Sequence, residues 1–372
     1  MDNQYSVELW LQRALDSHPW RVHKLSQAQL IFVSANMSLS CIANKPFTLR
    51  RLWKAMLIDP LISGNQSSGM RPPLLLTSQY RNCPPPRRQP PRSLILRDAI
   101  MRGDEYYRTI VSPFVVSRPP WLVGSVPASS PITPWAERKK LIFMAGHVPK
   151  AYISLTRYLI WRQIRSEADT TVLSQTLNCT FGAFIQCRQG REYWASRSVQ
   201  ELARFCHPWC GVNEVCGLST RISPAAALDT FWRNCAHYDH VDYAKESEDM
   251  KRDTVRLPHA QYLQLAMSHR FCVVAPGDYP STHKIAEAMA LGGAGGCIPV
   301  FVLPVSAEWS SERKDWHVTK RSLRLAVESN LPYTRWLDYC SVAYLVTEQT
   351  AQKMFTFVLD TLRAVTPAEV PL

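Results

Sequence analysis

Lys284 and Glu287 are the residues whose types and spacing most clearly permit chemistry. They follow the turn Pro276-Gly277-Asp278-Tyr279-Pro280, after which Ser281 or Thr282 could cap a helix. The start of a helix presents free backbone N–H groups and the positive end of its dipole, so it suits a phosphate. Lys284 would add a full charge in the first turn, and Glu287 could accept hydrogen bonds from sugar hydroxyls. The same two residues could also form an ordinary solvated ion pair on a helix surface.

Two apolar runs predict the strands that would position this turn. Phe271 to Ala275 predicts a buried strand, and Cys297 to Val302 predicts the next one. With the helix between them they form a strand–helix–strand unit, which is typical of a parallel α/β sheet. Cys272 and Cys297 lie in these predicted buried strands, where a free cysteine behaves as a small hydrophobic side chain. The uncharged stretch from Ala288 to Ala307 could span a bilayer, but its glycines and prolines predict a helix end, a turn and a strand instead.

A second strand and helix, further upstream, could bring more cations to the same place. Leu141 to Ala145 predicts a strand that ends at Gly146, and a helix is expected from about Ser154 to Ser166. Because ligands of doubly wound sheets bind at the carboxyl ends of the strands, both turns could line one cleft. Lys150 and Arg157 could then reach a phosphate or an acceptor, or they could be ordinary surface cations.

Further motifs stand in a fixed order along the chain: Ala28 to Val33, Ile142 to Gly146, Arg157, Leu159, Ser268, Phe271-Cys272, Pro276-Gly277-Asp278, Pro280-Ser281, Glu287-Ala288, Gly296 to Val300, Leu331-Pro332-Tyr333, Leu337-Asp338-Tyr339 and Ser341-Val342. This order of motifs resembles that of the exostosin-type glycosyltransferases. The resemblance is specific over residues 268–345 and weak before residue 130. The chain departs from the family pattern where Lys284 replaces an arginine and where extra glycines follow the helix.

The resemblance implies an α/β fold of the GT-B-like class, with two Rossmann-like lobes of which the N-terminal one is reduced. We expect the N-terminal, acceptor-side lobe at residues 1–135, with a Pro-rich loop at 60–93 and a linker at 112–135. The C-terminal, nucleotide-sugar-binding lobe is expected at residues 136–372.

The resemblance also implies an enzyme, a hexosyl- or glycuronosyltransferase that moves a sugar from a UDP-sugar to a glycan or glycoprotein acceptor with inversion. Apart from the donor we expect no cofactor and no metal, because the sequence contains no Asp-x-Asp motif and a helix start could neutralise the diphosphate. Asp98, Asp104 and Glu105 are candidates for the general base. The alternative is a weakly active or inactive exostosin-like subunit that binds glycan or a partner. The predicted donor-binding residues are Gly146, Lys150, Arg157, Gly277, Asp278, Ser281, Lys284 and Glu287.

The net charge of +13 favours anionic partners such as nucleotide diphosphates and acidic glycans. The spacing of basic and aromatic residues does not support nucleic-acid binding.

The first thirty residues show no signal peptide or membrane anchor, whereas the resemblance implies a Golgi location and is compatible with a homo- or heterodimer. Cys206, Cys210 and Cys216 could form a disulfide, stay as thiols or bind a metal. The glycine run from Gly292 to Gly296 follows a helix and precedes a strand, the reverse of a dinucleotide-binding fingerprint, so an oxidoreductase is not supported.

Overall fold

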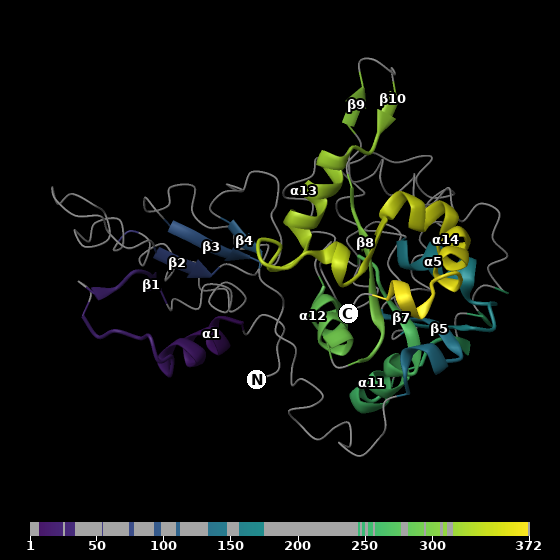
Figure 1. Cartoon of the computed structure of the whole chain (residues 1–372), viewed down its shortest axis with the longest axis horizontal. Coiled ribbons are helices and arrows are strands. Elements are labelled where there is room, and N and C mark those ends of the chain that lie inside the picture. The colour runs from purple at the N-terminus through teal and green to yellow at the C-terminus, as the bar shows by residue number, and fades with distance from the viewer. Residues whose placement is uncertain are drawn as a thin grey trace, which may run out of the picture. The chain divides into compact units, whose positions relative to one another are not determined.

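The computed structural model of the chain is shown in Figure 1. Contacts divide the chain into two units, one of residues 1–118 and 323–337, the other of residues 119–322 and 338–372, and each is described by itself. The predicted division of the chain at residue 135 stays a prediction. The structure describes residues 7–24, 27–33, 54, 74–77, 93–97, 109–111, 133–146, 156–174, 245, 248–249, 252–255, 257–276, 282–293, 295–305, 308–310 and 315–370.

The second unit is built on a five-stranded sheet in which every neighbouring pair is parallel, in the order β11-β8-β7-β5-β6. Along the chain, β6 is added on one side of β5, and β7, β8 and β11 follow on the other side. The strand order therefore reverses between β5 and β7, the place where open α/β sheets bind their ligands. The strands are β5 (Lys140–Gly146), β6 (Thr170–Ser174), β7 (His269–Val274), β8 (Ile298–Leu303) and β11 (Tyr344–Thr347).

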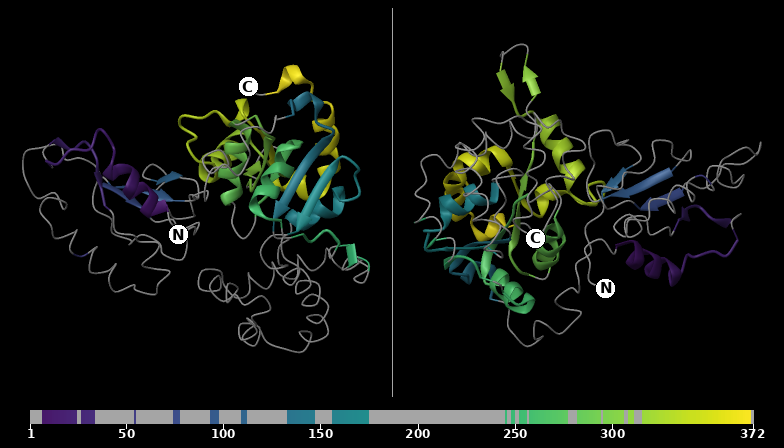
Figure 2. Two further views of the ribbon diagram at one scale, coloured as in Figure 1. Left: turned by 90° about the horizontal axis from the view of Figure 1, so that it is seen from below. Right: turned by 180° about the vertical axis from the view of Figure 1, so that it is seen from behind.

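Helices pack on both faces of this sheet (Figures 1 and 2). Side chains alternate between the faces along each strand, so Ile142 and Met144 join one core whereas Phe143 joins the other. One core includes α5 (Thr156–Ile164) and α14 (Glu348–Arg363), and the other includes α11 (His259–Met267) and α12 (His283–Gly293). The predicted α/β class with a parallel sheet is confirmed.

The strand–helix–strand unit that the sequence predicted is present. β7 and β8 are adjacent and parallel, with Val273 opposite Val300 and α12 between them in the chain. The stretch from Ala288 to Ala307 is divided as predicted, because α12 ends at Gly293 and β8 begins at Ile298. Within the described residues, no helix has the length and apolar character needed to cross a membrane.

Cys272 and Cys297 form a disulfide, a pairing that the sequence left open, and are not free thiols. The pairing of β7 with β8 brings their Cα atoms to 5.5 Å, within the range that a disulfide requires. The possibility of this disulfide followed from the predicted adjacency of the two strands, because each of the two apolar runs contains one cysteine.

The first unit contains a second parallel sheet, of four strands in the order β1-β2-β3-β4. Part of it, β2, lies inside residues 60–93, so the prediction of a loop is wrong for Leu74–Thr77. The Leu74-Leu75-Leu76 run buries enough apolar surface to form a strand directly after Pro72-Pro73, a position that proline tolerates. The strands are β1 (Ile31–Phe32), β2 (Leu74–Thr77), β3 (Ser93–Arg97) and β4 (Thr109–Val111).

The remaining elements are short or peripheral. The helix α1 spans Val7–Asp16. A hairpin of β9 (Glu308–Ser310) and β10 (Asp315–His317) precedes α13 (Lys320–Asn330). Three 3-10 helices complete the described chain: η4 (Trp135–Glu137), η6 (Tyr339–Ser341) and η7 (Pro367–Glu369).

Candidate functional site

The candidate site lies where β5 and β7 end, at the reversal of strand order in the second unit. Phe143 pairs with Cys272, and continuing this register places Gly146 beside Ala275. Both strand ends therefore lie at one edge of the sheet, as the sequence predicted. The helix α12 begins nearby in the chain, and Thr282 caps it, because its Oγ1 accepts from the backbone N–H of Lys284 at 3.4 Å.

Arg157 joins the two strand ends. From α5, its Nε and Nη2 donate to the carbonyl oxygen of Ala275 at 3.1 and 3.0 Å. A Cβ atom at Gly146 would lie 3.1 Å from Nη1 of Arg157, so a larger residue there would displace the guanidinium. Gly146 and Arg157, both predicted from the sequence for donor binding, therefore lie together. Arg157 supplies one fixed positive charge at this edge of the sheet.

Lys284 and Glu287 form an ion pair, with 2.7 Å between Nζ and Oε2. Their side chains are only 12% and 8% exposed, so the interpretation as a solvated surface pair is wrong. Burial lowers the pKa of Lys284 from its ordinary value, and the Glu287 carboxylate opposes this shift. Arg157 is close enough to lower the pKa of Lys284 further by charge repulsion, which places both cations in one electrostatic environment.

Tyr262 and His259 complete the site, and sequence reasoning missed both. Nζ of Lys284 lies 3.7 Å from the centre of the Tyr262 ring, a cation–π contact. Burial, together with the charge of the Glu287 carboxylate and a hydrogen bond to it, raises the pKa of Tyr262 well above its ordinary value. The His259 ring stacks on Tyr262 at 6.2 Å, with Nε2 3.8 Å from Oε1 of Glu287. His259 and Tyr262 lie three residues apart on α11, directly before β7, and this spacing is the sequence signal that could have identified them.

This arrangement can bind an anion. The described cluster contains two cations, Arg157 and Lys284, and one carboxylate, Glu287, which pairs with Lys284, so its net charge is positive. The positive end of the α12 dipole adds to that field. A buried, mostly desolvated cation interacts more strongly with an anion than a solvated one does. A diphosphate is the common biological group that matches these features.

Several predicted site residues cannot be placed, because they lie outside the described residues. They include Lys150 and the turn residues of the donor site, and all three candidates for the general base. The cysteines at 206, 210 and 216 also lie outside. Among the residues that the structure does describe, no group of three His, Cys, Asp or Glu side chains could hold a metal ion. The unplaced site residues are Asp98, Asp104, Glu105, Lys150, Gly277, Asp278 and Ser281.

The comparisons with known proteins agree with the motif order. The family model described as Exostosin GT47 domain matches residues 216–362. This range contains α11, β7, α12, β8 and β11, and with them Tyr262, Lys284 and Glu287, whereas β5 and Arg157 precede it. A comparison with curated proteins found no match. Residues 216–362 are therefore similar to the exostosin GT47 domain, and this match indicates a glycosyltransferase.

Proposed function

We propose that this glycosyltransferase binds a UDP-sugar at the Arg157–Lys284 site and transfers the sugar to a glycan or glycoprotein acceptor. One observation carries the proposal: Arg157 is fixed at the carboxyl end of β7, where the strand order reverses, and Lys284 lies in the first turn of α12, the helix that follows β7. In doubly wound sheets nucleotides bind at this place, with their phosphates on a helix start.

The proposed reaction inverts the configuration at the anomeric carbon. An acceptor hydroxyl attacks that carbon while a base takes its proton, and the bond from the carbon to the UDP oxygen breaks. Asp98, Asp104 and Glu105 remain the candidates for the base. The leaving diphosphate gains charge as the bond breaks, and Arg157, Lys284 and the start of α12 would stabilise that charge without a metal.

The sheet of the first unit supports a two-lobed, GT-B-like architecture. β1 to β4 are all parallel, as a Rossmann-like lobe requires. We propose that this unit is the reduced, acceptor-side lobe, and that the enzyme can work as a homo- or heterodimer.

The disulfide supports the proposed Golgi location. Disulfides form and persist in oxidising compartments and are rare in the cytosol. The Cys272–Cys297 bond lies inside the range matched by the GT47 model and joins β7 to the residue directly before β8. Folding in the secretory pathway would therefore agree with the chemistry of the core.

Calorimetric titration of UDP into the purified full chain tests the donor site. Lys284→Ala should weaken UDP binding by on the order of tenfold or more, because a charge-assisted contact contributes about 1.5–3 kcal/mol. Lys284→Arg, which restores the family residue, should keep the affinity. Lys353→Ala is the matched control, since Lys353 is an exposed lysine of α14 in the same unit. Glu287→Ala should impair discrimination between nucleosides and spare binding of inorganic diphosphate.

If Lys284→Ala binds UDP as tightly as the parent protein does, the start of α12 is not the phosphate site.

A second function, that of an inactive partner subunit, is favoured by one observation: Glu287 neutralises much of the Lys284 charge. Donor binding without transfer to any acceptor in a panel of glycans would select that function.

A further inference from the structure

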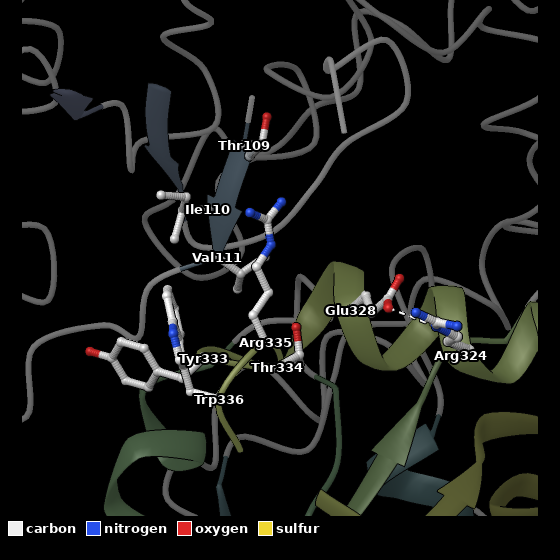
Figure 3. Close-up of a pocket in the computed structure, with 9 residues that line it drawn as sticks. All are labelled: Thr109, Ile110, Val111, Arg324, Glu328, Tyr333, Thr334, Arg335 and Trp336. Atoms are coloured by element: carbon white, nitrogen blue, oxygen red, sulfur yellow. Dashed lines mark hydrogen bonds and ion pairs between the residues drawn. The ribbon is translucent and has the colours of Figure 1, made fainter. Parts of the chain in front are cut away.

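The first unit contains a pocket of about 260 Å³ that none of the predicted site residues lines. It lies between β4 and the segment from the end of α13 to Trp336 (Figure 3). Pockets for drug-sized ligands typically measure roughly 300–1,000 Å³. A nucleotide sugar would not fit, whereas a single sugar ring is of suitable size.

Two aromatic side chains stand at this pocket with unusual exposure. Trp336 is 73% exposed and Tyr333 is 47% exposed. Tyr333 also has a φ of 59°, and no other non-glycine residue of the described chain has a positive φ. A bulky residue in that conformation is strained, and such strain is concentrated at binding sites. Exposed aromatic faces next to a strained backbone are features of a ligand-binding surface.

Arg335 adds a positive charge to the pocket. In Figure 3 the side chains of Arg335 and Trp336 both extend toward β4. Among the described residues no carboxylate pairs with Arg335, whereas Arg324, at the other side of the pocket, is held by Glu328 at 2.8 Å. Arg335 is therefore available for an anion from outside, and its planar fork matches a carboxylate or a sulfate.

We propose that this pocket binds one anionic sugar residue of the acceptor glycan. The apolar C–H face of the sugar ring packs on Trp336, and its carboxylate or sulfate ester accepts hydrogen bonds from Arg335. A sugar ring has both an apolar face and polar edges, so it matches an indole beside a guanidinium. The assignment of the sugar to an acceptor rests on the proposed transferase function, but the binding itself does not.

Three methyl glycosides that differ only at carbon 6 test the proposal: the β-glucuronide, the 6-sulfated β-glucoside and the neutral β-glucoside. Their affinities for the full chain are measured by ligand-observed saturation-transfer NMR. At least one anionic glycoside should bind roughly two- to fivefold more tightly than the neutral one, as expected for a charge pair at an exposed arginine. The two anionic arms distinguish a carboxylate from a sulfate.

Variants then locate the binding. Arg335→Gln should abolish the preference for the anionic glycosides, while Arg321→Gln, which removes the same charge from an exposed position of α13, should leave it unchanged. Trp336→Ala should weaken binding of all three glycosides. Equal binding of charged and neutral glycosides, or an unchanged preference in Arg335→Gln, would overturn the proposal.

UDP titration of the same samples separates this inference from the proposed function. The pocket variants should bind UDP as the parent does, because neither residue belongs to the donor site. If the parent protein binds the anionic glycosides but does not bind UDP, the transferase function is contradicted and the assignment of the pocket still holds.

Discussion

At the scale of single residues, Lys284 stands out because it is both buried and charged. Its ammonium is held by the Glu287 carboxylate and by the Tyr262 ring, so two side chains, one from α12 and one from α11, fix its position. Burial lowers the pKa of Lys284, which means that it loses its proton at a lower pH than an exposed lysine. Burial raises the pKa of Tyr262, so this phenol stays neutral over the same range.

This shift predicts a pH dependence of donor binding. The proposed donor site uses the protonated form of Lys284, so the affinity for UDP should fall as the pH rises through the lowered pKa of that residue. Lys284→Arg keeps its charge throughout, because arginine stays protonated, and should remove the fall. Calorimetric titration of UDP at a series of alkaline pH values measures both profiles. Parallel profiles of the parent and Lys284→Arg would assign the change to another group.

Residue types and spacing predicted some members of this site and not others. Lys284 and Glu287 lie next to a turn that glycine and proline mark in the sequence, so they could be found there. Tyr262 and His259 come from a helix about twenty residues earlier, and only the folding of α11 against α12 brings them near. The burial of the Lys284–Glu287 pair is also a tertiary effect, because Tyr262 covers the ammonium. The three-residue spacing of Lys284 and Glu287 in the sequence does not indicate that the pair is buried.

At the scale of elements, the β7–α12–β8 unit was predictable because its signals are local. The apolar runs, the turn residues and the glycines at the helix end all lie within 35 residues of each other. β2 was missed for the opposite reason: three leucines were surrounded by prolines, and their strand depends on pairing with β3 in a sheet that no local pattern announced. Side-chain burial in that sheet outweighed the local preference for a loop.

The Cys272–Cys297 disulfide should contribute substantially to the stability of this unit. The double variant Cys272→Ala, Cys297→Ala should lower the free energy of unfolding by about 2–4 kcal/mol, because the bond closes a loop between residues 25 apart in sequence. Urea unfolding followed by circular dichroism measures the change. Cys340→Ala is the control, since Cys340 is an exposed free cysteine and its replacement should change little. A double variant as stable as this control would show that the bond does not restrain the fold.

At the scale of the whole molecule, the two proposed sites belong to two different parallel sheets. The second unit has its cations at the reversal of strand order, a place that fold rules alone identify once the order of strands is known. The pocket of the first unit follows no such rule. It depends on residues 323–337 clustering with β4, more than 200 residues earlier in the chain, which local sequence patterns cannot reveal.

The charge of the second-unit site leads to a prediction about metals for the whole enzyme. A diphosphate leaving group must be neutralised, and glycosyltransferases that use a metal for this purpose need carboxylate ligands to hold it. The sequence contains no Asp-x-Asp motif, whereas Arg157, Lys284 and the start of α12 supply positive charge at one sheet edge. UDP binding and sugar transfer by the full chain should therefore survive treatment with EDTA, and added manganese should not increase either. Lys284→Ala should lose UDP affinity equally with and without EDTA, because its contribution does not depend on a metal. Transfer that is lost on chelation and restored by manganese would mean that a metal, and not this pair of cations, neutralises the diphosphate.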